Sequence, residues 1–419
     1  MKKRFILTAI TLSLLSIESS WGQTEDILRP RKENMVKPVK REIVKPKPIE
    51  MTKEQYFDMA KRQVNPIDAQ AYYRKAAEMG HAEALDSLGM YYYEGRGLVK
   101  NLYEAATCFK KSAELGNASG MYHWGRVNQF CEGVEKNLAE TIKWFTKSAN
   151  LGNDKAMIGL ALCYREGEGV NKDYSEAVKW FRKAVELRND KAMYNLGVMY
   201  YQGWGVSKNY TEAAKLYQKA AELGNVKATY NLGVCYENGH GVTKNENEAF
   251  RLYQKAAAKG EIHAMNNLGL MYSEGRGVSK NEIEAVKWLT KAAEAGNVNA
   301  MANLGARYLN GQDVSRNYSE AAKWLKKAVE NNDVSAMTNL GYMYEKGYGV
   351  EKNGSEAFKL YQKAANLGDS MAMNNMGNCY FDGIGVAKND TEAEKWFKKA
   401  CDKGCTLAKT NMEKLFGRK

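Results

Sequence analysis

A glycine, preceded by leucine in most copies, returns along this chain every 36 residues. It falls at Gly89, Gly125, Gly197, Gly233, Gly269, Gly305, Gly341 and Gly377, and Ala161 occupies the one remaining position. A fixed period of roughly 20 to 50 residues indicates an array of identical supersecondary units. The fold of the whole chain must therefore follow from the fold of one unit.

One unit, residues 262–296, is predicted to hold two helices. In the first, Ile262–Ser273, apolar residues recur at the helical spacing, and Gly269 lets a neighbouring helix approach its backbone. Gly275 and Gly277 then end this helix, because glycine reaches left-handed dihedral angles at low cost. The second helix is predicted over 281–294.

The second helix carries an N-terminal signal and an apolar stripe. Asn281 and Glu284 form an N-x-x-E pattern, predicted to be a capping box in which asparagine caps the helix amides and glutamate reaches back. Ala285, Trp288 and Ala292 form the predicted buried stripe. The same box recurs in the other repeats as Asn101/Glu104, Asn137/Glu140, Asp173/Glu176, Asn209/Glu212, Asn245/Glu248, Asn317/Glu320, Asn353/Glu356 and Asn389/Glu392.

Each unit is thus an antiparallel helix hairpin, and stacked hairpins predict an all-α, right-handed α/α superhelical solenoid with a concave inner face. Nine repeats are predicted over residues 81–404. Residues 52–80 are predicted to be a degenerate half repeat, with helices possible at Thr52–Arg62 and Ala69–Met79. Residues 405–419 are predicted to form a C-terminal capping helix, since end units lack one neighbour.

The N-terminus has the features of a secretory signal peptide. A basic triplet, Lys2–Arg4, precedes an apolar run of 11 residues, Phe5–Leu15, and the small residues Ser20 and Gly22 suit a cut after Gly22. The run is too short to span a bilayer, and an uncleaved signal anchor is the alternative. We expect residues 1–22 to be removed and the mature protein to be exported, to the periplasm or out of the cell. Membrane contact is expected only through the uncleaved precursor.

Residues 23–51 are predicted to be a flexible linker rich in proline and lysine, because they hold four of the five prolines and few large apolar residues. Residues 1–51 contribute +5 to the formal net charge of +13, which leaves +8 spread over the array. Such a diffuse charge favours a mildly basic, soluble surface, and we expect no nucleic-acid partner.

The seven cysteines do not form a disulfide framework. Cys163, Cys235 and Cys379 share one repeat position, and units two or more steps apart lie beyond disulfide reach. These three are predicted to be small core residues. Cys401 and Cys405 are close enough to pair, or they stay free.

The pattern A-x-x-x-LG-x-x-Y-x-x-G-x-G-V-x-KN-x-x-E-A-x-x-W-x-x-KAA-x-x-G resembles the Sel1-like repeat, a relative of the tetratricopeptide repeat. In the unit described above it is carried by Gly269, Tyr272, Gly275, Gly277, Val278, Lys280, Asn281, Ala285, Trp288, Lys291 and Ala292. The second repeat departs from the pattern with Asn128 and Cys131, and the seventh with Asp313 in place of the second turn glycine, so distorted turns are expected there. The resemblance implies a scaffold that holds partner proteins in the groove of the first helices. A cysteine-rich secreted subgroup implies penicillin binding and β-lactamase activity, but it has paired cysteines in every repeat, which this chain lacks.

No pattern for catalysis or metal binding stands out. The recurring G-x-G follows a helix instead of a strand and lacks the third glycine of a dinucleotide-binding loop. The four histidines, His81, His123, His240 and His263, lie in different units without metal-ligand spacing and are expected to be solvated or packed. We expect no enzyme activity, cofactor or metal.

Three sets of residues are predicted to line the groove. The residue two positions before the repeat glycine is asparagine in six consecutive units: Asn195, Asn231, Asn267, Asn303, Asn339 and Asn375. Stacked asparagines either bind the backbone of an extended peptide or lock neighbouring repeats together, and one residue can do both. Lys155, Lys191 and Lys227 share a second position and favour acidic partner groups, and Tyr122, Tyr194 and Tyr230 add aromatic surface.

The sequence therefore predicts a non-catalytic, exported, monomeric scaffold that binds a protein or peptide in its groove. The alternatives are a cell-wall glycan-binding module that uses the groove tyrosines, and a penicillin-binding or β-lactamase-like enzyme of the cysteine-rich kind.

Overall fold

The computed structural model describes residues 51–417, which form 21 α-helices and no strand. The predicted signal peptide and nearly all of the predicted linker lie outside these residues. The first helices of the hairpins, called A helices here, are α1 Lys53–Arg62, α3 Ala82–Glu94, α5 Ala118–Phe130, α7 Asp154–Glu166, α9 Asp190–Gln202, α11 Val226–Asn238, α13 Ile262–Glu274, α15 Val298–Asn310, α17 Val334–Lys346, α19 Ser370–Asp382 and α21 Thr406–Phe416. The second, or B, helices are α2 Pro66–Glu78, α4 Leu102–Glu114, α6 Leu138–Asn150, α8 Tyr174–Glu186, α10 Tyr210–Glu222, α12 Glu246–Ala257, α14 Glu282–Glu294, α16 Tyr318–Glu330, α18 Gly354–Asn366 and α20 Asp390–Asp402.

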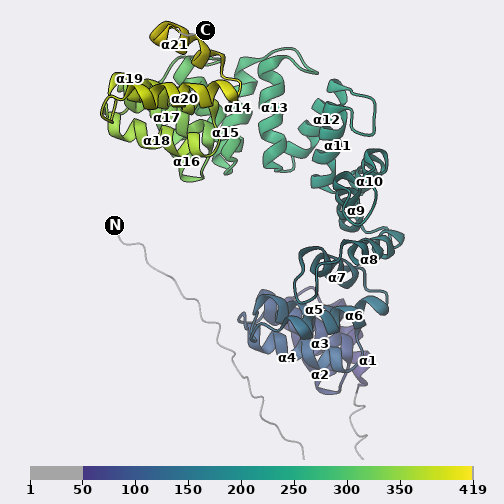
Figure 1. Ribbon diagram of the computed structural model, residues 1–419. Helices are drawn as coiled ribbons and strands as arrows, with labels where there is room; N and C mark the ends of the chain where they lie inside the picture. Colours follow the sequence, from purple (N-terminus) through teal and green to yellow (C-terminus); the bar gives the residue numbers. More distant parts are fainter. Residues whose placement is uncertain (1–50, 418–419) are drawn as a thin grey trace, which may run out of the picture. The chain divides into compact units, whose positions relative to one another are not determined.

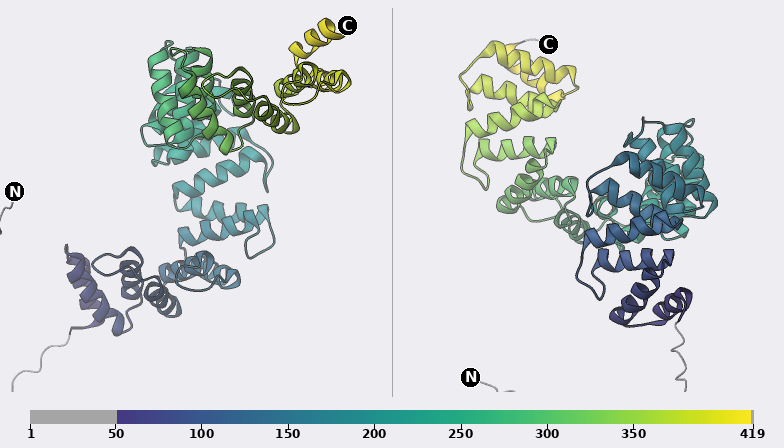
Figure 2. Two further views of the ribbon diagram at one scale, coloured as in Figure 1. Left: turned by 90° about the vertical axis from the view of Figure 1, so that its left-hand side faces the viewer. Right: turned by 90° about the horizontal axis from the view of Figure 1, so that it is seen from below.

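Each A helix except the last, α21, packs on the B helix that follows it, and each B helix packs on the next A helix. Figure 1 shows this succession of hairpins along residues 51–417, and the two views in Figure 2 show each hairpin beside its sequence neighbours. The predicted all-α solenoid is therefore confirmed. None of the described helices is both long and apolar enough to cross a bilayer.

The repeat glycine is the point of closest approach inside each hairpin. A Cβ atom on Gly269 would lie 2.8 Å from Leu289 Cγ and 3.0 Å from the Ala285 carbonyl oxygen, both on α14. The residue 20 positions after the repeat glycine is buried in all nine units: Phe109, Phe145, Phe181, Tyr217, Tyr253, Leu289, Leu325, Tyr361 and Phe397. The absence of a side chain at the glycine thus makes room for a large side chain on the B helix.

The predicted B-helix stripe was wrong in one member. Ala285 and Ala292 are fully buried, but Trp288 is only half-buried, and the core position is the next residue, Leu289. Trp288 lies at the edge of the core, where its Nε1 donates to Glu284 at 3.1 Å and the Lys291 ammonium lies 4.5 Å from its ring centroid. An indole with a polar edge suits such a boundary better than a dry core.

Two glycines shape the turn between the helices. Gly275 ends α13 in the left-handed region, at φ +71°, and donates its N–H to the Met271 carbonyl. Gly277 is also left-handed, at φ +65°, and a Cβ atom there would overlap the Glu246 backbone carbonyl at the start of α12. The second turn glycine therefore brings each turn against the B helix of the preceding repeat.

One of the two hydrogen bonds of the predicted capping box is present. Asn281 does accept from the Glu284 N–H at 3.0 Å, but its own N–H donates to the Tyr272 carbonyl at 2.9 Å, so Glu284 has no donor to reach back to. The Glu284 carboxylate instead binds Lys287 at 2.7 Å and the Trp288 indole. All nine B-helix caps of the full repeats donate to the backbone carbonyl nine residues earlier. The N-cap N–H that a capping box would use is therefore already bonded across the turn.

The two turns expected to be distorted keep the ordinary geometry. Cys131 ends α5 in the left-handed region, at φ 58°, with its N–H on the Val127 carbonyl. Asp313 takes φ 61°, close to the glycines it replaces. A non-glycine residue adopts this conformation at some cost, and at Asp313 hydrogen bonds from Ser273 at 2.6 Å and Arg307 at 2.7 Å hold the side chain in place.

Replacing Gly277 by alanine tests the role of the second turn glycine. We expect a loss of about 3 kcal/mol or more in the free energy of unfolding, because the methyl group meets a backbone carbonyl and the φ angle is unfavourable. Gly296→Ala is the matched control, since it has φ +93° and nothing within 4 Å of its Cβ position. That change should cost only about 1–2 kcal/mol. Urea unfolding followed by circular dichroism measures both, and equal losses would contradict the proposed inter-repeat contact.

Candidate functional site

The A helices form one continuous face of the array. Consecutive A helices touch directly, most clearly α3 with α5 and α15 with α17, in addition to their contacts with B helices. Polar side chains also bridge them, as where Gln129 on α5 donates to Glu168, just after α7, at 2.8 Å. We call the surface lined by exposed A-helix residues the A-helix groove.

Two cavities lie in the A-helix groove. The first, of about 740 Å³, extends over α5, α7 and α9 and includes Tyr122, Lys155 and Lys191. The second, of about 530 Å³, extends over α9, α11 and the start of α13 and is lined by Tyr194, Lys227, Tyr230 and Asn231 among others. The structure thus brings seven of the twelve predicted site residues to two adjoining cavities. The other five are all asparagines.

The six predicted asparagines are half-buried on the A helices. Asn195 accepts from Arg165 of the preceding repeat at 3.0 Å and donates to the Lys191 carbonyl of its own helix at 2.8 Å. Asn303 donates to Asn266 of the preceding repeat at 3.3 Å. Both residues therefore lock neighbouring units.

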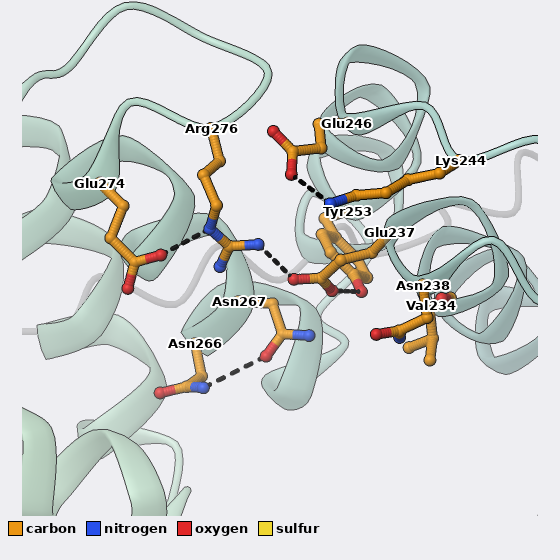
Figure 3. Close-up of polar contacts among 10 residues, drawn as sticks. All are labelled: Val234, Glu237, Asn238, Lys244, Glu246, Tyr253, Asn266, Asn267, Glu274 and Arg276. Atoms are coloured by element: carbon orange, nitrogen blue, oxygen red, sulfur yellow. Dashed lines mark hydrogen bonds and ion pairs between the residues drawn. The ribbon is translucent and has the colours of Figure 1, made fainter.

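Asn267 and Asn375 each accept a hydrogen bond from the asparagine that precedes them on the same helix. Asn266 donates to Asn267 at 3.2 Å, as Figure 3 shows, and Asn374 donates to Asn375 at 3.3 Å. Burial raises the pKa values of Tyr230 and Tyr253. Hydrogen bonding with the Asn267 amide partly offsets this rise. These contacts belong to the packing of the array.

Asn231 and Asn339 differ from the other four. Asn231 lines the second cavity. Burial raises the pKa values of Tyr194 and Tyr217, and hydrogen bonding with the Asn231 amide partly offsets this rise. Asn339 has no hydrogen-bond partner among residues 51–417. Locking and binding are therefore divided among the members of the asparagine set.

The sequence interpretation missed a seventh member, Asn411 on α21. It lies 36 residues after Asn375 and donates to Asn374 at 2.9 Å and to Asn378 at 3.4 Å. The 36-residue spacing alone could have identified it. Through this residue the terminal helix is held by the same kind of contact as an internal repeat.

The predicted groove tyrosines are half-buried. Tyr122 stacks on Phe145 with ring centroids 5.7 Å apart, Tyr194 packs on Tyr217, and Tyr230 packs on Tyr253. Burial raises the pKa of all three. One face of each ring is thus occupied by the core, which leaves edges and hydroxyls for the groove.

The predicted groove lysines are exposed, and none has an ion-pair partner in the described part of the chain. The nearest carboxylates along the chain are engaged elsewhere. Asp154 accepts from Asn189 at 2.6 Å, and Asp190 accepts from Asn225 at 2.9 Å. Uncompensated ammonium groups on a concave surface attract anionic groups.

A second feature missed from the sequence is a polar clasp between repeats. Figure 3 shows Glu237 on α11 accepting from Arg276, the residue between the two turn glycines of the next repeat, at 2.5 Å. The same carboxylate accepts from the Tyr253 hydroxyl at 2.5 Å. Comparable pairs, 39 residues apart, are Tyr93 with Glu132, Gln129 with Glu168, and Tyr201 with His240.

The cysteines and histidines serve structure. All seven cysteines are free, including Cys401 and Cys405, and burial raises the pKa of Cys163, Cys235 and Cys379 to about 12. His123 lies 2.7 Å from Asp86, His240 stacks on Tyr210, His263 contacts Asn297 and His81 caps α3. Within residues 51–417, no cluster of three potential ligands suits a metal ion.

Helix hairpins of constant length, stacked in register and presenting a groove on the A helices, define a tetratricopeptide-like helical solenoid. The Sel1 repeat model matches residues 58–81, 82–117, 118–153, 154–189, 190–225, 226–261, 262–297, 298–333, 334–369 and 370–405. The chain belongs to the Sel1 repeat family. Solenoids of this class generally act as non-catalytic scaffolds for protein–protein interactions.

Two solved structures agree with this assignment. One is a protective antigen of uropathogenic Escherichia coli strains that displays an SLR fold, with 30% identity, a TM-score of 0.74, and coverage of 87% of this chain and 80% of that one. The other is a Sel1 repeat protein from Oxalobacter formigenes, with 36% identity, a TM-score of 0.55, and coverage of 60% of this chain and 100% of that one. No curated protein matches the chain.

Glu237→Ala tests the clasp. We expect a loss of about 1–3 kcal/mol in the free energy of unfolding, because Arg276 and the buried Tyr253 hydroxyl lose their shared acceptor. Glu274→Ala is the control, because it removes the other carboxylate that pairs with Arg276. The Glu274 side chain is 51% exposed, against 19% for that of Glu237. Urea unfolding compares the two, and an equal effect would show that the clasp adds nothing to the array.

Thiol labelling tests the burial of the cysteines. We expect iodoacetamide at pH 8 to modify the exposed Cys131 first, while Cys163, Cys235 and Cys379 stay protonated because their pKa is about 12. Since an exposed thiol ionises near pH 8.5, raising the pH from about 9 towards 12 favours the unfolded state, and stability is lost in that window. Mass spectrometry of labelled peptides reads the order, and rapid native labelling of Cys235 would contradict it.

Proposed function

We propose that this protein is an exported, monomeric, non-catalytic scaffold that holds an extended segment of a partner protein in the A-helix groove. The observation that carries the proposal is the pair of adjoining groove cavities over α5 to α13, lined by Tyr122, Lys155, Lys191, Lys227 and Asn231. Concave surfaces with a few unpaired polar groups are the usual binding sites of helical repeats.

The groove residues favour a peptide partner with acidic groups. Three exposed lysines without ion-pair partners supply positive charge, and Asn339 keeps both donor and acceptor capacity free of described residues. An extended peptide offers backbone N–H and C=O groups to such amides at regular intervals. Affinity then comes from the backbone, and preference comes from the side chains that differ between repeats.

The proposed export rests on the N-terminal sequence, in which the basic triplet and the apolar run Phe5–Leu15 have the proportions of a signal peptide. The alternatives have less support. A glycan site needs open aromatic faces, whereas the three groove tyrosines are packed on core rings. The enzyme hypothesis depends on paired cysteines, and the seven here are free.

Site-specific photo-crosslinking in intact cells tests the scaffold function. A benzophenone amino acid at Lys227, an exposed residue that lines the second groove cavity, should yield a discrete crosslinked complex that mass spectrometry identifies. The control is the same group at Lys326, an exposed residue of the B helix α16. Equal crosslinking from both positions, or none from the groove position, would contradict groove binding.

Alanine at Asn231 and Asn339 together gives a second test of the same proposal. We expect partner capture to be lost while far-ultraviolet circular dichroism stays unchanged. Loss of helicity would instead assign these asparagines to locking.

A further inference from the structure

The asparagine set begins at the fourth repeat, and the groove differs in the third repeat, just before it. The position of Asn195 is occupied there by Gly159, and the position of Tyr194 by Ile158. A Cβ atom on Gly159 would lie 2.9 Å from Cε2 of Phe145, so the core ring reaches the groove floor at this point. Position 159 lacks the amide that the later repeats carry, and the Phe145 ring beneath it, which stacks with Tyr122 and is 1% exposed, makes the groove floor apolar there.

The apolar floor extends to both sides of Gly159. Ile158 and Leu162 of α7 and Phe130 at the end of α5 line the same cavity of about 740 Å³. Phe130 is 57% exposed, although a large aromatic side chain usually finds cover. The cavity therefore has room and an apolar lining for at least one large side chain of a ligand.

Cations surround this floor. Lys155 and Lys191 belong to the cavity lining and have no ion-pair partner among the described residues. Arg126 also lines it; its guanidinium lies 5.7 Å from the Phe130 ring centroid and 3.8 Å from the Glu132 carboxylate. The acidic lining residue Asp190 is bound to Asn225.

This combination is confined to the N-terminal part of the array. At the position of Lys155, the sixth to ninth repeats carry the uncharged or weakly basic residues His263, Asn299, Ser335 and Met371. Both the cations and the apolar floor are therefore absent from the equivalent A-helix positions of those repeats. A ligand that needs both is directed to α5, α7 and α9.

We propose that the cavity over α5, α7 and α9 binds a peptide segment in which one large apolar side chain is flanked by aspartate or glutamate residues. The apolar side chain lies over Gly159, and its flanking carboxylates pair with Lys155 and Lys191. This inference rests on the proposed scaffold function and adds where the partner binds and what chemistry it has.

A display selection with random peptides identifies the chemistry of the ligand. Random 12-residue peptides are selected on the purified protein, and the enriched peptides are synthesised for affinity measurement by fluorescence anisotropy. We expect an enriched motif with a leucine or aromatic residue between acidic residues. Affinity should fall as salt rises, because exposed charge pairs are screened.

Charge reversal locates the site. In Lys155→Glu with Lys191→Glu, affinity for the enriched peptide should fall at least about tenfold, since like charges then face each other. Lys215→Glu with Lys326→Glu is the control; it changes the net charge equally, at exposed B-helix residues outside the groove. Gly159→Asn, which introduces the residue of the six later repeats, should also weaken binding, with circular dichroism to show that the fold is kept.

The outcomes separate the inference from the scaffold function. An acidic motif that loses binding only in the groove variants supports the inference. Enriched peptides that lack acidic residues, or that bind the reversed variant equally well, overturn it and leave the scaffold function standing. Enrichment of no peptide at all overturns both.

Discussion

The contact between the repeat glycine of an A helix and the large side chain 20 residues later sets the geometry of eight of the nine full hairpins, and Ala161 takes the place of the glycine in the other. At Gly269 the missing side chain admits Leu289 and brings the Ala285 carbonyl within contact distance. The second turn glycine allows an equally close approach between hairpins, because Gly277 lies against the start of the preceding B helix. Both contacts bring a backbone carbonyl, that of Ala285 or that of Glu246, against a glycine. A small change in helix length would break them, which is consistent with the constant 36-residue interval.

Within that frame, the residues that differ between repeats fall into two sets. One set joins neighbours: the residue between the turn glycines pairs with the A helix before it, as Arg276 does with Glu237. These pairs use different chemistry at different joints, so one repeat does not replace another without loss of a partner. The other set faces the groove, where Lys155 and Lys191 have no ion-pair partner among the described residues.

Most of the architecture could be predicted from the sequence, because local interactions determine it. The period, the turn glycines and the asparagine N-caps identify both helices of a unit to within a residue or two of the observed bounds. Predictions failed where a group had a choice of partners. Trp288 was assigned to the core that Leu289 fills, and Glu284 was expected to bond an N–H that the Tyr272 carbonyl already accepts.

The candidate site shows the same division. The sequence by itself determined that the chain forms stacked helix hairpins and which repeat positions form each row of the A helices, since spacing along a helix decides which side of it a residue occupies. Only the tertiary structure decided which members of a row are already engaged: Asn195 and Asn303 bond the preceding repeat, whereas Asn339 bonds no described residue. The reason is physical: a hydrogen bond depends on the distance to a side chain about 36 residues away, and only the packed neighbour sets that distance.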